Sequence, residues 1–176
     1  KKMVTMDVKE TNNIVLIIGK TEGHIDQSLF ARTILDEKNG PPPEVNLFNE
    51  KNNGESLLNL IEKDFIKSAH DVSLGGIITA ISKMSIKGNK GIKLSKSKNL
   101  MNELDYLFAE DQGRYVIEVK QENLKDVVKI LDKNSVHHEE LGFITEKDLI
   151  INEKTKVTID ELKSYNTNWL TNFMSA

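Results

Sequence analysis

The stretch that decides the fold reads His70-Asp71-Val72-Ser73-Leu74-Gly75-Gly76, and it runs directly into an apolar segment. The apolar residues recur at three- and four-residue intervals, at Leu74, Ile77, Ile78, Ile81 and Met84. This spacing predicts an amphipathic helix. Ser73 is a good N-cap for that helix, because its hydroxyl can accept a backbone N–H. Gly75 and Gly76 would each cost up to about 1 kcal/mol relative to alanine in a first turn. Their presence predicts that something approaches the backbone closely.

The start of this helix is also a candidate anion site. Free N–H groups at a helix N-terminus favour phosphate. His70 and Asp71 would stand at the edge of such a site, where they could hydrogen-bond or hold a cation. The other interpretation is that the small residues serve packing alone and that Asp71 is only a cap. The residues by themselves leave both interpretations open.

Upstream of this stretch, apolar runs alternate with breaks. Residues Ile14 to Ile18 form an apolar, β-branched run closed by Gly19, which predicts a strand buried on both faces. Helices are predicted at about 26–35 and 54–66, separated by the prolines at 41–43. Residues 1–13 are polar, and we expect them to be a tether from a missing N-terminal lobe.

Downstream of this stretch, the pattern continues to mix strands and helices. It predicts strands at 92–94, 107–109, 114–119, 137–144 and 149–151, and helices at about 99–106 and 124–131. Thr158 and Glu161 have capping-box spacing and begin a last helix. That helix carries Leu162, Tyr165, Trp169 and Phe173 at packing intervals. The mixture predicts an α/β (α+β) domain over 14–176, with helices packed on a mixed β-sheet.

Composition narrows the class of protein. The net charge of −3 argues against a nucleic-acid partner, which would favour a basic chain. No apolar run approaches the roughly 20 residues of a membrane-spanning helix, so no membrane partner is expected. The chain has no cysteine, which excludes disulfides and thiolate metal sites within it. A cytoplasmic location fits these features.

A second motif is Phe108-Ala109-Glu110-Asp111-Gln112-Gly113-Arg114-Tyr115-Val116. Gly113 permits a tight turn, and Arg114 presents a planar fork suited to carboxylate or phosphate. Glu110 is a candidate acid or cation ligand. The alternative is a Glu110–Arg114 surface pair that only orders a hairpin.

These two motifs resemble the C-terminal domain of the aminoimidazole ribonucleotide synthetase (PurM-like) superfamily. The branch that usually reads His-Asp-Val-Ser-Asp-Gly-Gly is phosphoribosylformylglycinamidine synthase, although Leu74 stands here in place of the second aspartate. The second motif is similar to the family's Phe-x-Glu-x-x-Gly-Arg segment. A weaker likeness covers Gly19 to Ser28, where the family commonly has Leu-Gly-Gly-Ser; from it only Ser28 is carried over. The likeness spans about 14–173.

The resemblance implies a PurM C-terminal domain-like fold and a parent enzyme of purine synthesis. That enzyme would use ATP and Mg²⁺ to amidate formylglycinamide ribonucleotide, with ammonia from a separate glutaminase subunit and with a small PurS-type subunit as a further partner. Its catalytic residues would lie in the missing lobe, so this chain alone is expected to be inactive. The implied nucleotide- or phosphate-binding residues are Ser28, His70, Asp71, Ser73, Gly75, Gly76, Glu110, Gly113 and Arg114, and Asp71 is the candidate metal ligand.

Two alternatives stay open at this point. One is the corresponding lobe of another superfamily member: aminoimidazole ribonucleotide synthetase, selenophosphate synthetase or thiamine-phosphate kinase. The other is a non-catalytic docking module, in which the glycine-rich turn of residues 70–76 serves packing alone. The Glu-x-x-Gly-Arg segment and the C-terminal tryptophan helix favour the synthase.

Overall fold

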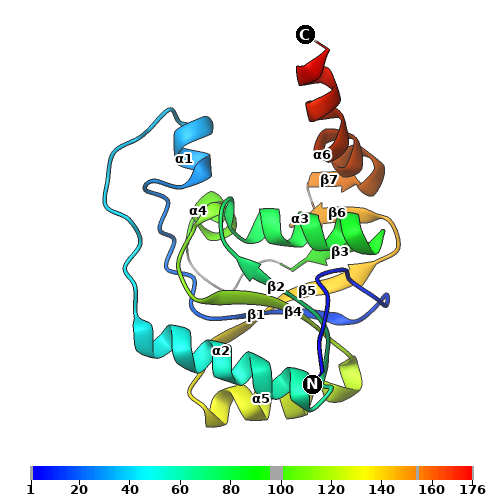
Figure 1. The fold of residues 1–176 in the computed structure, drawn as a ribbon. Helices are drawn as coiled ribbons and strands as arrows, with labels where there is room; N and C mark the ends of the chain where they lie inside the picture. Colours follow the sequence, from blue (N-terminus) through cyan, green and yellow to red (C-terminus); the bar gives the residue numbers. More distant parts are fainter. Residues whose placement is uncertain (1, 96–100, 154, 176) are drawn as a thin grey trace.

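A mixed seven-stranded sheet forms the centre of the computed structural model, which describes residues 2–95, 101–153 and 155–175 (Figure 1). The strand order is β2-β4-β1-β5-β3-β6-β7. Neighbouring strands pair antiparallel, except that β3 and β6 pair parallel. The strands are β1 (Ile14–Ile18), β2 (Ile66–Val72), β3 (Gly91–Leu94), β4 (Arg114–Val119), β5 (His138–Thr145), β6 (Asp148–Ile151) and β7 (Thr155–Thr158). The predicted mixed sheet is confirmed.

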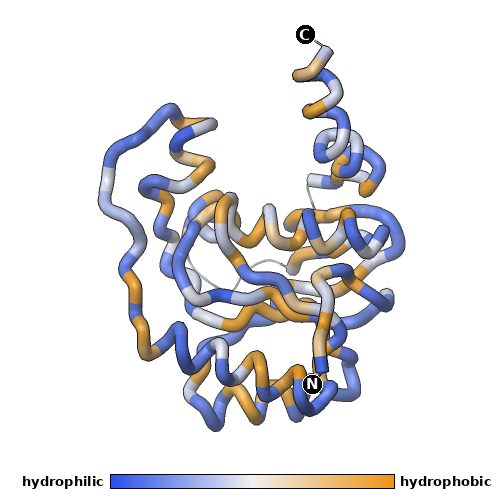
Figure 2. Tube along the Cα trace, viewed as in Figure 1, coloured by the Kyte–Doolittle hydropathy of each residue, from blue (hydrophilic) through white to orange (hydrophobic). Residues whose placement is uncertain are grey.

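Helices cover both faces of this sheet (Figure 1). Helices α2 (Leu47–Glu62) and α5 (Leu124–Lys133) lie on one face, and α3 (Gly76–Gly88) lies on the other. The hydropathy of α2 and α5 alternates along each helix, as one-sided burial requires (Figure 2). The remaining helical segments are α1 (Leu29–Thr33), α4 (Glu103–Phe108), the 3₁₀ turn η1 (Gln121–Asn123) and α6 (Ile159–Met174).

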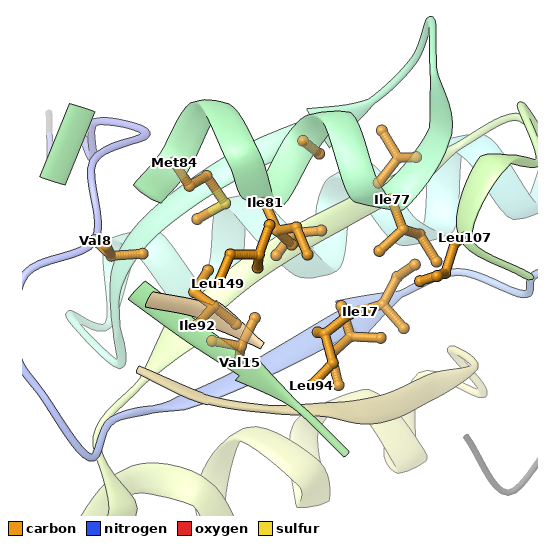
Figure 3. Close-up of a cluster of buried hydrophobic side chains, with 14 of the residues drawn as sticks. Val8, Val15, Ile17, Ile77, Ile81, Met84, Ile92, Leu94, Leu107 and Leu149 are labelled. Carbon is orange, nitrogen blue, oxygen red and sulfur yellow. The ribbon is translucent and has the colours of Figure 1, made fainter. Parts of the chain in front are cut away.

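Strand β1 lies at the middle of the sheet, and this position explains why its sequence is apolar throughout. Val15 and Ile17 face α3 and pack with Ile77 and Ile81 in one core cluster (Figure 3). The alternate residues of the strand, Leu16 among them, pack beneath α2 and α5 in a second cluster. Because successive side chains of a strand point to opposite faces, a strand covered on both sides is apolar throughout. The predicted strand at Ile14–Ile18 is therefore confirmed.

Several predicted elements differ from the structure. The predicted helix at 54–66 is instead α2, which begins at Leu47 and ends at Glu62. Its predicted last residue, Ile66, begins the unpredicted strand β2. Residues 107–109 do not form a strand, because 107 and 108 complete α4. Helix α1 begins at Leu29 rather than near 26. Strand β7 was also not predicted, and part of the predicted helix at 99–106 lies outside the described residues.

The segment expected to be a tether packs against the sheet. Val8 is buried, and the carbonyl of Thr5 accepts a hydrogen bond from the amide of Ala69 at 3.1 Å. The carboxylate of buried Glu118 accepts from the amides of Lys9 and Glu10 at 2.8 and 3.1 Å. These contacts attach residues 5–13 to the domain, and the boundary placed at residue 13 stays a prediction. Among the described residues, no helix has the length and apolar character needed to cross a bilayer.

Candidate functional site

The His70–Gly76 motif lies where β2 ends and α3 begins. Nδ1 of His70 lies 2.9 Å from Oδ1 of Asp71. The His70 side chain is 11% exposed, and its Nε2 atom is enclosed without a hydrogen-bond partner among the described residues. The Asp71 side chain is 62% exposed. A buried histidine nitrogen and an open carboxylate thus lie side by side at the rim of the sheet.

The charge state of Asp71 is set by opposing influences. Burial is the largest single influence and acts to raise its pKa. The hydrogen bond and charge of His70, together with hydrogen bonds from the Asp71 backbone and the Ser73 side chain, outweigh it. The pKa of Asp71 therefore lies below its ordinary value, and the carboxylate is ionised at neutral pH.

The two glycines of the motif adopt backbone conformations that disfavour other residues. Gly75 is the N-cap residue of α3, with φ of 82°, and Gly76 has φ of 70°. A Cβ atom on Gly76 would lie 2.6 Å from the carbonyl oxygen of Leu107. The predicted close approach is real, and the approaching group is the protein's own backbone. Ser73 is not the N-cap; its carbonyl accepts the Gly76 amide at 3.0 Å instead.

Glu110 links this loop to a distant part of the chain. Its Oε1 atom accepts from the amide of Gly75 at 2.8 Å and from the amide of Leu29 at 2.7 Å. Both amides belong to helix N-termini, where a negative charge is favourable. A carboxylate of the protein therefore holds the position that sequence reasoning assigned to a phosphate, and the Gly75 amide is engaged.

Arg114 points into the protein rather than toward solvent. The residue is 1% exposed, and its guanidinium donates to the carbonyls of Ala109 and Asp111 at 2.7 and 3.0 Å and to Oγ1 of Thr21 at 3.0 Å. Its carboxylate neighbour is Asp111, at 3.8 Å, so the alternative of a Glu110–Arg114 surface pair is not observed in the described residues. Burial lowers the pKa of Arg114, while the charge of Asp111 opposes this shift. The guanidinium thus shapes the loop at 109–113 from within.

Asp111 is a residue that sequence reasoning missed. Its Oδ2 atom accepts from the amides of Glu22 and Gly23 at 2.9 and 3.1 Å, and Oδ1 accepts from the amide of His24 at 3.2 Å. Three successive amides thus surround one carboxylate. The sequence feature that could have identified Asp111 is its position inside the Glu-x-x-Gly-Arg segment, two residues before Gly113.

Ser28 and Gly113 have local structural roles. Ser28 is fully buried and caps α1, because its Oγ atom accepts from the Ala31 amide at 3.1 Å. Gly113 has φ of 64°, and its carbonyl accepts from Nδ2 of Asn53 at 2.9 Å. The structure therefore brings Gly75, Glu110 and the start of α1 together, with Arg114 and Gly113 supporting the same loop.

A polar cleft of about 570 Å³ lies beside these loops. Its lining includes Asp111 and Gln112, the loop after β1, and the first turns of α2. Neither His70 nor Gly75 lines it, so the cleft adjoins the second motif and not the first. The described residues contain no group of three or more histidine, cysteine or acidic side chains that could hold a metal ion.

The sequence has relatives across nearly its whole length. It is 67% identical over 99% of the chain to the phosphoribosylformylglycinamidine synthase subunit PurL of Pelagibacter ubique, and 34% identical over 98% to that of Bartonella henselae. The chain covers 24% and 23% of these proteins, about a quarter of their length.

Solved structures share the fold. T. maritima PurL complexed with FGAR superposes with a TM-score of 0.76 at 19% identity, over 91% of this chain and 29% of the other. T. maritima PurL complexed with ATP superposes with a TM-score of 0.68 at 17% identity, over 92% of this chain and 27% of the other. PurLQS from Thermotoga maritima superposes with a TM-score of 0.69 at 20% identity, over 90% of this chain and 27% of the other. The sequence profile of the AIR synthase related protein C-terminal domain matches residues 10–152. The chain therefore belongs to the family of AIR synthase related C-terminal domains, and its fold is that of the PurM-like C-terminal domain.

Proposed function

We propose that this chain is the C-terminal lobe of a phosphoribosylformylglycinamidine synthase. The observation that carries the proposal is the 67% identity, across nearly the whole chain, to a PurL subunit. Lobes of other superfamily members are not favoured, because the two relatives described above, at 67% and 34% identity, carry the PurL name. Since the chain spans about a quarter of those proteins, the proposed activity belongs to a longer protein.

The proposed reaction amidates formylglycinamide ribonucleotide. ATP transfers its γ-phosphoryl group to the amide oxygen, which releases ADP and turns that oxygen into a leaving group. Ammonia then adds to the carbon, and inorganic phosphate departs to give the amidine. Negative charge develops on phosphoryl oxygens in the first step, so fixed N–H donors and cations would stabilise the transition state.

The residues of this chain would contribute to binding and to loop position. Asp71 and Ser73 are exposed at the rim, where they would face a ligand held by another lobe of the longer protein. His70 holds Asp71 in place through its Nδ1 contact. Gly75, Gly76 and Gly113 set the loop conformations, while Glu110 and Arg114 join the loops to one another. Ser28 supports this arrangement by capping α1.

Magnesium binding would need groups from elsewhere. Asp71 offers one exposed carboxylate, and the described residues assemble no complete metal site around it. Mg²⁺ usually takes one or two carboxylates together with substrate phosphates. The donor set described here is therefore insufficient to hold the ion, and we assign Mg²⁺ no step carried by this chain.

The proposal also covers partners and location. A glutaminase subunit would supply ammonia, and a small PurS-type subunit would complete the assembly. Support comes from the fold likeness to PurLQS from Thermotoga maritima. A cytoplasmic location is part of the same proposal, because the substrates would be metabolites of purine synthesis.

The test uses the full-length protein that contains this chain. Purified protein is mixed with formylglycinamide ribonucleotide, ATP, Mg²⁺ and ammonium, and ADP release is followed. We expect release that requires both the ribonucleotide and ammonium. Asp71→Asn should lower kcat/KM at least tenfold, whereas Asp126→Asn, at an exposed position on α5 across the sheet from α3, should not change it. Absence of substrate-dependent ADP release would refute the synthase assignment, and failure to bind any nucleotide would favour a docking module.

A further inference from the structure

Most of α6, from Ser164 onward, has a composition unlike the rest of the chain. From Ser164 to Met174 the helix contains no charged residue, although charged residues make up 29% of the whole sequence. The stretch is instead rich in aromatic, aliphatic and amide side chains. Depletion of charge and enrichment in aromatic residues characterise the cores of protein interfaces.

The apolar side chains of this stretch are open to solvent. Tyr165 is 79% exposed, Trp169 is 62% exposed and Phe173 is 71% exposed. They follow one another at intervals of four residues and therefore share a helix face. The rings of Trp169 and Phe173 lie 6.3 Å apart between centroids. Leu170 and Met174 extend the same surface and are 52% and 75% exposed. We name these five residues the α6 apolar stripe.

The stripe continues a face that is already packed on the domain. At the base of α6, Ile159 is 4% exposed and Leu162 packs against the core cluster under α3. Nζ of Lys163 donates to Oδ1 of Asn89 at 2.5 Å. Leu162, Trp169 and Phe173 are seven and four residues apart, so they lie on one helix face. The face of α6 that packs on the domain at Leu162 thus continues into the part of the helix that projects away from the sheet (Figure 1).

An isolated helical turn does not hold itself in place. Helices of this length owe most of their stability to the packing of an apolar face, and an exposed patch of large apolar side chains marks an interaction surface. The capping box at Thr158 and Glu161 fixes only the first turn. The stretch from Ser164 to Met174 therefore presents an apolar surface suited to a partner that is itself apolar.

We propose that the α6 apolar stripe docks onto a part of the same, longer polypeptide outside residues 1–176. The length of the relatives carries the choice of occupant: about three quarters of each PurL relative lies outside the region matched by this chain. A covalently linked surface meets the helix at a high effective concentration, whereas a second copy does so only at high protein concentration. The inference rests on the proposed membership in a longer protein and not on its chemistry.

Site-specific photo-cross-linking in the full-length protein tests this contact. p-Benzoylphenylalanine is introduced in place of Trp169 and, as the matched control, in place of the exposed Thr171, which lies on the side of α6 that faces away from Trp169. Protein grown in heavy and light nitrogen is mixed before irradiation, so that links within one molecule are distinguished from links between copies by mass spectrometry. We expect position 169 to link, within one molecule, to peptides outside residues 1–176, with at least fivefold less product from position 171.

Every other result overturns the proposal. Mixed-isotope links would show a second copy as the occupant, and links to a separate protein would show a subunit interface. Equal or absent linking at the two positions would show that the stripe has no partner. As a second measurement, Trp169→Asp should lower the melting temperature of the full-length protein by several degrees, whereas Thr171→Asn should leave it unchanged. The ADP-release assay on the same preparation separates this outcome from that of the synthase proposal, because an inactive protein can still form the link.

Discussion

The Oε1 atom of Glu110 lies 2.8 Å from the amide nitrogen of Gly75, and the same oxygen lies 2.7 Å from the amide nitrogen of Leu29. One atom thus accepts hydrogen bonds at the starts of two helices, from amides that are 46 residues apart in sequence. The arm between α1 and α2 is mostly exposed, and Nε2 of Gln27 donates to its carbonyls at Lys38 and Gly40 at 2.7 and 3.2 Å. The Glu110 carboxylate therefore couples the start of α1, where this arm begins, to the loop of residues 73–76 before α3.

Replacement of Glu110 by glutamine should loosen both attachments. The amide side chain keeps an acceptor but loses the charge, and hydrogen bonds to charged groups are the stronger ones. We expect faster hydrogen exchange at the amides of Gly75 and Leu29, with a loss of about 1 kcal/mol in the free energy of unfolding. The exposed Glu122→Gln serves as the control. Unchanged exchange at both amides would show that Glu110 does not hold the loop.

Glu118 should be far more important for stability. Its fully buried carboxylate accepts from the amides of Lys9 and Glu10, from Nδ2 of Asn13 and from Oγ of Ser68. Glu118→Ala would leave four donors without their acceptor, at a cost of about 3 kcal/mol or more in the free energy of unfolding. Urea denaturation measures this loss. Glu118→Gln keeps one acceptor oxygen and should cost less, and an equal cost for both variants would contradict the hydrogen-bond explanation.

Gly76→Ala should destabilise the protein, whereas Gly54→Ala should stabilise it. A Cβ on Gly76 would lie 2.6 Å from the Leu107 carbonyl at a positive φ, which predicts a cost of about 2–5 kcal/mol. Gly54 lies inside α2, and its Cβ would meet only the Tyr115 hydroxyl, at 3.6 Å. Alanine there should add about 0.5–1 kcal/mol. Thermal unfolding measures the loss of stability expected for Gly76→Ala and the gain expected for Gly54→Ala.

Asp71 predicts a small acid dependence of stability. Its pKa in the folded protein lies below the ordinary 3.8, so its contribution is fully present above about pH 4 and is lost as the pH falls through the folded pKa. The side chain is 62% exposed, which limits the contribution to below about 1 kcal/mol. The difference in unfolding free energy between the wild type and Asp71→Asn should therefore shrink between pH 5 and pH 2. If this difference in unfolding free energy instead grew as the pH fell, the pKa of Asp71 would be raised in the folded protein and the prediction would be wrong.

Much of the sheet was predictable because its central strands carry simple patterns. The apolar run at Ile14–Ile18 indicated a doubly covered strand, and the spacing of Ile77, Ile81 and Met84 indicated the helix above it. The capping box at the start of α6 was also correctly predicted. Each of these signals is local, and each agrees with the tertiary environment.

The missed features depend on partners far away in sequence. Strand β2 contains Lys67, His70 and Asp71, which mask its alternation, and pairing with β4 holds it extended. The short apolar run at 107–109 indicated a strand, but the Asn102 side chain caps a helix there by accepting the Leu104 amide. The role of Glu110 as a link between helix starts could not be read from its neighbours. It depends on Leu29, 81 positions upstream.

The position of β1 in the sheet has a consequence for biosynthesis. Both of its pairing partners, β4 and β5, come much later in the chain. The apolar segment Ile14–Ile18 is therefore synthesised long before either pairing strand exists. At a synthesis rate of roughly 5–20 residues per second, it remains unpaired for several seconds. The sheet cannot assemble until β4 and β5 have been synthesised. During this delay the nascent protein exposes an apolar segment that is prone to aggregation, and such a segment is a suitable binding site for a chaperone.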